Sequence, residues 1–254
     1  MSSPRRILLK KRLCATFVEA KLTQLSMSGL LKSSVGRKVA MALSAFFLMI
    51  FLIMHVSINF TSVFSEDLFN QLSHFMGTNP VVQGVMQPIL IIGVVFHFVM
   101  GFILEARNRA SRGVGYAKNN AAASASWVSR NMLISGLVIL AFLGLHFYDF
   151  WIHEMTVKYI EGDMSGLIDP NNSTSGFRYY EELREKFVSP VRVGIYTLSF
   201  VLLALHLLHG FNSAFQSVGA NNKYTKGLKG FGKVYAIGIP ALFIFIAIFH
   251  HFTH

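Results

Sequence analysis

Residues 33–55 read SSVGRKVAMALSAFFLMIFLIMH. Two basic residues, Arg37 and Lys38, precede an almost unbroken apolar run that ends on a histidine. Because a helix needs roughly 20 predominantly apolar residues to cross a bilayer, this run and its continuation predict a membrane span at 39–60. An ionisable side chain deep inside such a span is costly and usually marks a cofactor or a transport path. His55 is therefore a candidate functional residue.

Four more stretches have the same character, at 81–104, 132–152, 191–215 and 234–252. The chain is 53% hydrophobic and only 14% charged, with a mean hydropathy of +0.49, whereas soluble domains average about 25% charged residues. We therefore predict an all-α integral membrane protein with five transmembrane helices. Residues 1–32 are predicted to be a basic amphipathic leader on the cytoplasmic surface, with a disordered leader or a mitochondrial presequence as alternatives, and residues 33–254 the membrane domain.

The basic residues alternate between the two ends of these spans. Residues 1–38, 105–131 and 216–233 together hold 18 of the 23 Lys and Arg residues. The 61–80 connection has none, and 153–190 has seven acidic residues against four basic. By the positive-inside rule, the N-terminus is expected in the cytoplasm and the C-terminus outside. A net charge of +11 distributed in this way does not indicate a nucleic-acid surface.

Cysteine use and missing motifs limit what the chain does alone. Cys14 is the single cysteine, so the chain holds neither an iron–sulfur cluster nor an internal disulfide. The sequence also lacks the glycine-rich motifs of nucleotide, nicotinamide and flavin sites. In redox chemistry, another subunit would have to meet the soluble substrate.

Histidines in four of the spans fall at two depths. At 1.5 Å per helical residue, His55 and His146 lie roughly 24–26 Å from the cytoplasmic edge. His97 and His209 lie about 9–11 Å from it. Two histidines from different helices at each level match bis-histidine haem b, one imidazole on each face of the iron, so we expect two haems stacked across the membrane. His206 is the alternative fourth ligand, and histidines used for packing or proton transport are the competing interpretation.

Other residues near these levels are weaker candidates. Gly93, Gly101, Gly144 and Gly210 would let a macrocycle approach the helix backbone, although glycine is common in membrane helices. Asp149 follows His146 by one turn and could orient a ligand, take part in quinone protonation or reach water. Arg37 and Lys38 could pair with haem propionates or with a partner subunit, but topology is their default role. We expect the remaining histidines at the outer ends to be solvated or interfacial: His153, His250, His251 and His254.

The five-span layout, residues 33–55, LGLH at 143–146 and LLHG at 207–210 resemble the di-haem cytochrome b anchor of succinate:quinone oxidoreductases. The resemblance covers about residues 30–252 and is strongest to the single-anchor form of menaquinone-linked succinate dehydrogenases and fumarate reductases. It implies a distal haem on His55 and His146 and a proximal haem on His97 and His209. It also implies flavoprotein and iron–sulfur subunits on the cytoplasmic side of a bacterial inner membrane, and quinone reduction near the outer face.

The chain departs from that family at two positions. Leu207 and Gly77 stand where some relatives carry glutamates, the second in the outer connection after the first span. A proton path through the first position therefore cannot be carried over, and the quinone site stays unassigned. Glu66, Asp67 and His74 are polar neighbours of that second position without a family match. The alternatives are the cytochrome b subunit of another quinone-linked complex such as a nitrate reductase, a histidine-dependent proton or metal transporter, and a purely structural anchor.

Overall fold

The computed structural model describes residues 33–110, 132–220 and 225–253. This part of the chain contains five helical segments long and apolar enough to cross a membrane: Ser34–Thr61, Val82–Ala110, Met132–Tyr159, Pro190–Ser217 and Thr225–Phe252. The five predicted spans are confirmed, and each helical segment continues beyond its predicted bounds at one end or at both. Within the described ranges the backbone forms no β-strand, only an isolated bridge between Leu167 and Phe177. The predicted leader, 1–32, lies outside the described residues.

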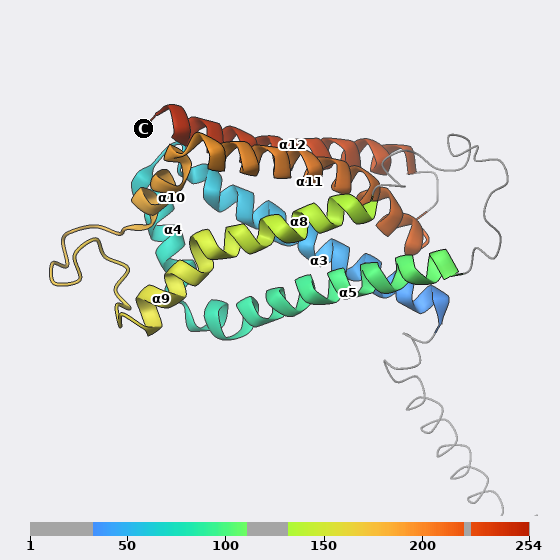
Figure 1. Cartoon of the computed structure of the whole chain (residues 1–254), viewed down its shortest axis with the longest axis horizontal. Helices are drawn as coiled ribbons and strands as arrows, with labels where there is room; N and C mark the ends of the chain where they lie inside the picture. Colours follow the sequence, from blue (N-terminus) through green and yellow to red (C-terminus); the bar gives the residue numbers. More distant parts are fainter. Residues whose placement is uncertain (1–32, 111–131, 221–224, 254) are drawn as a thin grey trace, which may run out of the picture.

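The long helices form an antiparallel bundle (Figure 1). They are α3 (Ser34–Thr61), α5 (Gln87–Ala110), α8 (Met132–His146), α11 (Pro190–Ser217) and α12 (Thr225–Phe252). The shorter helices α4 (Glu66–Thr78), α9 (His153–Tyr159) and α10 (Tyr179–Val188) gather at one end, together with the C-terminus. We call this the capped end. The opposite end, where α3 and α12 begin, is the open end.

Serine side chains fix where several helices begin. Ser33 accepts a hydrogen bond from the backbone N–H of Gly36 at 2.8 Å, just before α3. Ser189 caps α11 in the same way, with Pro190 in the first turn. Ser65 caps α4, whose first turn carries Glu66 and Asp67. Serine at the N-cap followed by acidic residues is the usual signature of a helix start, and it indicates α4, which the sequence analysis did not predict.

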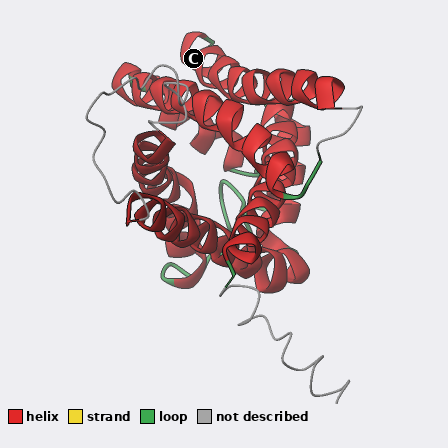
Figure 2. Ribbon diagram, turned by 90° about the vertical axis from the view of Figure 1, so that its right-hand side faces the viewer, coloured by secondary structure: helices red, strands yellow, loops and turns green. Residues whose placement is uncertain are grey.

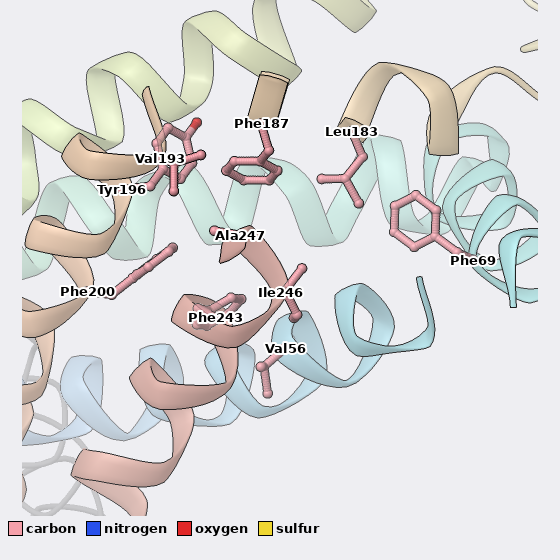
Figure 3. Packing of buried hydrophobic residues seen from close by; sticks show 10 residues of the cluster. All are labelled: Val56, Phe69, Leu183, Phe187, Val193, Tyr196, Phe200, Phe243, Ile246 and Ala247. Carbon is pink, nitrogen blue, oxygen red and sulfur yellow. The ribbon is translucent and has the colours of Figure 1, made fainter. Parts of the chain in front are cut away.

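The tight packing lies on one side of the bundle. Figure 3 shows the larger cluster, in which residues of α3, α4, α10, α11 and α12 meet around Phe200, Phe243 and Ala247. A second cluster, nearer the open end, joins α3, α11 and α12 around Ala42, Phe211 and Ala236. The second and third spans are different, since only 6% of their most apolar window is buried, against 39% in the last span. The helices that carry His97 and His146 therefore leave most of their apolar surface uncovered by the described part of the chain.

Two short π-helical segments interrupt these loosely packed spans. The first, η1 (Val82–Met86), precedes α5, and Pro88 follows it closely. The second, η2 (Phe147–Ile152), begins directly after His146 and joins α8 to α9. Single π-turns inside α-helices occur frequently at functional sites, so the position of η2 next to a candidate ligand bears on the site described below.

An ion network fastens the connection between α9 and α10 to the capped end. Glu154 pairs with Lys158 at 2.8 Å and with Arg178 at 2.7 Å, and Arg178 also pairs with Glu182. Burial opposes the charge on Arg178, but the hydrogen bonds and charges of Glu154 and Glu182 outweigh it and raise the pKa of the guanidinium. Turns at Asp169–Asn172 occupy the middle of the connection, as expected from its composition.

The expectation that His250 is solvated or interfacial is wrong. Its side chain is fully buried, because α10 packs across the end of α12. The hydroxyl of Ser62 donates to the carbonyl of Asn59 at 2.6 Å, so the Nε2–H of His250 must be the donor in its 2.8 Å contact with Ser62. His153 remains partly exposed beside Glu182. His251 donates to the carbonyl of Phe187, and His254 lies outside the described residues.

Candidate functional site

A cavity of about 810 Å³ runs along the bundle between α3, α5, α8 and α11. Figure 2 views the molecule from the open end and shows how the long helices are arranged in the bundle. Apolar side chains line most of the cavity, and the five histidines singled out from the sequence all reach it: His55, His97, His146, His206 and His209. Its volume lies in the upper part of the range of 300–1,000 Å³ found for ligand pockets.

His55 and His146 form the pair nearer the capped end. Their ring centroids are 5.8 Å apart, with an interplanar angle of 82°. Phe51 stacks on His55, and Phe142 stacks on His146. The Nδ1 atom of His146 is buried and has no hydrogen-bond partner among the described residues. The structure thus brings together the two histidines that the depth argument assigned to one level.

The pair nearer the open end is His97 and His206. Their ring centroids are 6.4 Å apart, with an interplanar angle of 65°. His97 comes from α5 and His206 from α11, on opposite walls of the cavity. A side-chain Cβ at Gly136 would lie 3.8 Å from Cε1 of His206, in ordinary van der Waals contact, so a side chain larger than alanine would crowd the imidazole.

Two serines fix the proton positions on this second pair. The hydroxyl of Ser44 donates to the carbonyl of Met41 at 2.8 Å and lies 3.0 Å from Nδ1 of His97. A hydroxyl has one proton to donate, so Nδ1–H of His97 must be the donor to Ser44. Ser135 repeats the arrangement, with its hydroxyl on the carbonyl of Met132 at 2.9 Å and Nδ1 of His206 at 3.3 Å. Both imidazoles therefore present an unprotonated Nε2.

His209 is placed differently. It lines the cavity toward the open end, and its Nε2 lies 3.1 Å from the hydroxyl of Ser213, one turn along the same helix. The reason for preferring it also disappears with the observed helix ends. His97 lies 13 residues before the end of α5, compared with 11 for His206 and 8 for His209 before the end of α11. The assignment of His209 as the fourth ligand stays a prediction, while the ring that faces His97 belongs to His206.

The four facing histidines fit a macrocycle held through its iron. With metal–nitrogen bonds of about 2 Å, two imidazoles on opposite sides of one iron have ring centroids roughly 6.3 Å apart. The observed separations, 5.8 and 6.4 Å, bracket that value. Ordinary aromatic pairs also fall within 4.5–7 Å, so the separation alone does not decide. The continuous cavity is a second observation, and the His97–His206 pair adds a third. Metal-binding histidines almost always donate their other ring proton to a neighbouring acceptor, and both of these rings hold Nδ1–H on a serine.

Comparison of the chain with protein families, with curated proteins and with solved structures finds no match. The functional argument therefore rests on the geometry and chemistry of the site.

The glycines proposed to admit a macrocycle divide into two groups. Gly101 and Gly210 line the cavity, as does Gly136, which the sequence analysis did not single out. Gly93 does not line it. An added Cβ at Gly93 would lie 2.7 Å from the ring of Phe47, so this glycine allows α5 to pack closely on α3. Gly144 also lies outside the lining, with no atom within 4 Å of an added Cβ.

Asp149 does not reach water, one of the three roles considered for it. Its side chain is 2% exposed, and it lies in η2, where it is bonded to residues of α11. Sequence reasoning also missed Ser44 and Ser135. Both are polar residues inside apolar spans, at distances from the span ends comparable with that of His97, and this coincidence was the available signal.

Polar side chains gather where the cavity meets the open end. Those that line it there are Lys38 of α3, Glu105 and Asn108 of α5, and His209, Ser213, Gln216 and Ser217 of α11. Lys38 thus faces the cavity as well as marking the predicted cytoplasmic edge. This mouth contrasts with the apolar walls around the histidine pairs and suits a ligand with one charged edge.

Proposed function

We propose that the chain is the di-haem cytochrome b membrane anchor of a succinate:quinone oxidoreductase, the family of succinate dehydrogenases and fumarate reductases. The single observation that carries the proposal is the succession of two facing histidine pairs along one cavity. A cavity that crosses most of the bundle and holds a bis-imidazole position near each end is suited to moving electrons across a bilayer. Resemblance of residues 33–55, 143–146 and 207–210 to that family supplies the choice of complex.

The ligand assignment follows the geometry. His55 and His146 would hold the haem b nearer the capped end. His97 and His206 would hold the one nearer the open end, and this choice replaces our sequence-based preference for His209. Once bound, the two haems accept and release single electrons. The chain is therefore an electron-transfer subunit without a succinate site of its own.

The protein side chains supply orientation, electronics and exclusion of water. Ser44 and Ser135 hold the imidazoles of His97 and His206 with Nε2 toward the cavity, and the hydrogen bond at Nδ1 makes each ligand more basic. Apolar walls keep water from the iron positions, and Phe51 and Phe142 fix the rings of the other pair. At the open end, Lys38 and His209 offer donors to propionate carboxylates.

The charge pattern sets the direction of the complex. The open end carries the basic flanks, so it is the cytoplasmic side, where the flavoprotein and iron–sulfur subunits would dock. Electrons from succinate would then reach the His97–His206 level first and the His55–His146 level second. Quinone, by family resemblance menaquinone, would be reduced near the capped end, which would lie at the outer face of the bacterial cytoplasmic membrane.

Purification of the intact complex tests the assignment. We expect a flavoprotein and an iron–sulfur protein to co-purify, and added succinate to reduce both haems of the complex. A molybdenum protein as the partner would favour a nitrate-reductase-type cytochrome instead. Proton or metal uptake into vesicles by the chain alone, without haem absorbance, would replace electron transfer by transport.

A further inference from the structure

A buried charge cluster stands directly behind the His55–His146 level. Asp149, in η2, is 2% exposed. Its Oδ2 accepts a hydrogen bond from the hydroxyl of Tyr196 at 2.8 Å, and its Oδ1 lies 3.1 Å from Nη2 of Arg192. The Arg192 side chain is 31% exposed, so the cluster extends from the surface of the capped end to the buried carboxylate.

Tyr196 connects this cluster to the candidate ligand. Its ring lines the cavity and meets the ring of His146, with centroids 6.3 Å apart. Asp149 itself follows His146 by three residues, within the π-turn that begins directly after the ligand. The carboxylate therefore lies within about one helical turn of the imidazole. The hydrogen bond from Tyr196 to Oδ2 and the ion-pair contact of Arg192 with Oδ1, both from α11, fix the position of the charge.

The carboxylate of this cluster is poorly screened, because it is buried. A buried carboxylate is costly to keep and is tolerated only when it is paired. Uncharged side chains could join η2 to α11 without that cost, so a structural role alone does not require a charge here. Charges in such surroundings act on neighbouring groups over about 10 Å with an effective dielectric constant of about 20. Reduction of a haem adds one electron and changes no bond, so a fixed charge nearby acts directly on the redox equilibrium.

We propose that Asp149 and Arg192 set the midpoint potential of the haem held by His55 and His146. The inference rests on the proposed function, since it requires that haem. Asp149 favours the oxidised iron and Arg192 favours the reduced iron, while Tyr196 positions the carboxylate. All three are positioning residues: Asp149 and Arg192 act through their charges on the group bound by His146, and Tyr196 acts through the carboxylate that it holds.

Redox titration of the haem spectrum of the complex tests the proposal. At a fixed applied potential, Asp149→Asn raises the ratio of reduced to oxidised haem at this level about tenfold, which corresponds to about 59 mV for one electron. Arg192→Gln lowers the ratio, by a smaller factor because its side chain is 31% exposed. The double variant lies between the wild type and Asp149→Asn, and Tyr196→Phe, which removes a hydrogen bond but no charge, shifts the ratio less than Asp149→Asn.

The inner haem is the internal control. Its midpoint, identified as the component that remains in a His146→Ala variant, stays unchanged in all four variants. Shifts of the same sign in Asp149→Asn and Arg192→Gln, equal shifts in both haems, or no shift overturn the proposal. If Asp149→Asn loses the outer haem, Arg192→Gln alone decides by the direction of its shift. A wild-type complex without haem refutes the proposed function, whereas a haem-bearing complex with insensitive midpoints overturns only this inference.

Discussion

Replacement of His206 by alanine should remove one haem per chain, while replacement of His209 should remove none. In the structure His206 stands opposite His97, with ring centroids 6.4 Å apart, and its Nδ1 lies 3.3 Å from Ser135. Alanine at 206 leaves the iron position at this level with a single imidazole, from His97. Alanine at 209 removes a side chain bonded to Ser213 at 3.1 Å, a loss of about 1 kcal/mol of stability.

The assay is the ratio of haem to protein in complexes purified from a haem-replete host, together with the reduced spectrum. We expect a ratio of two for the wild type and for His209→Ala, and one for His206→Ala. The haem that remains in His206→Ala should be the one lost in His55→Ala. The reverse result, with two haems in His206→Ala and one in His209→Ala, would refute the reasoning from facing rings and fixed Nδ1 protons.

Three further results are expected. Gly136→Leu should displace His206 and lower the haem ratio to one, while the matched change at Gly144, which has open space around it, should leave it at two. Ser44→Ala and Ser135→Ala should each weaken retention of the inner haem about 10- to 100-fold and raise its midpoint potential. The control is Ser199→Ala, which removes a hydroxyl that donates to a carbonyl of its own helix and should change neither quantity in the same titrations. Haem depletion should accelerate amide hydrogen exchange in the second and third spans more than in the last, because only 6% of their apolar windows are buried; equal acceleration in all spans would count against a cavity filled by haem.

The sequence was sufficient for features that depend on length and composition. Five apolar stretches of the right length predicted five spans, because the bilayer leaves a spanning helix no alternative to internal hydrogen bonding. Counting residues from the charged ends also placed His55 and His146 at one depth, and the structure brings their rings together. Depth along a helix follows from the rise per residue, so it can be read from sequence spacing alone.

Rotation around a helix could not be read in the same way. His206 and His209 differ by about 4.5 Å in depth and about 60° in direction, and the choice between them depended on where α5 and α11 end. Those ends, at Ala110 and Ser217, include charged and polar residues that the hydropathy pattern excludes from a span. The contacts of His206 with α8, at Ser135 and Gly136, are tertiary contacts that hydropathy does not reveal.

The capped end shows a second limit. Burial of Asp149 and His250 depends on residues distant in the sequence, Arg192 and Tyr196 for the first and Ser62 for the second. A polar residue at the end of an apolar run is expected at the membrane surface unless another element covers it. Here α10 and the start of α11 provide that cover, and no local pattern around either residue reveals it.

The most direct test of the central claim is the haem content of the purified chain, measured with its reduced absorption spectrum and redox titration. The account predicts close to two b-type haems per chain, each with two imidazole ligands and each lost separately when one histidine pair is altered. A well-folded chain recovered without haem from a haem-replete host would contradict it.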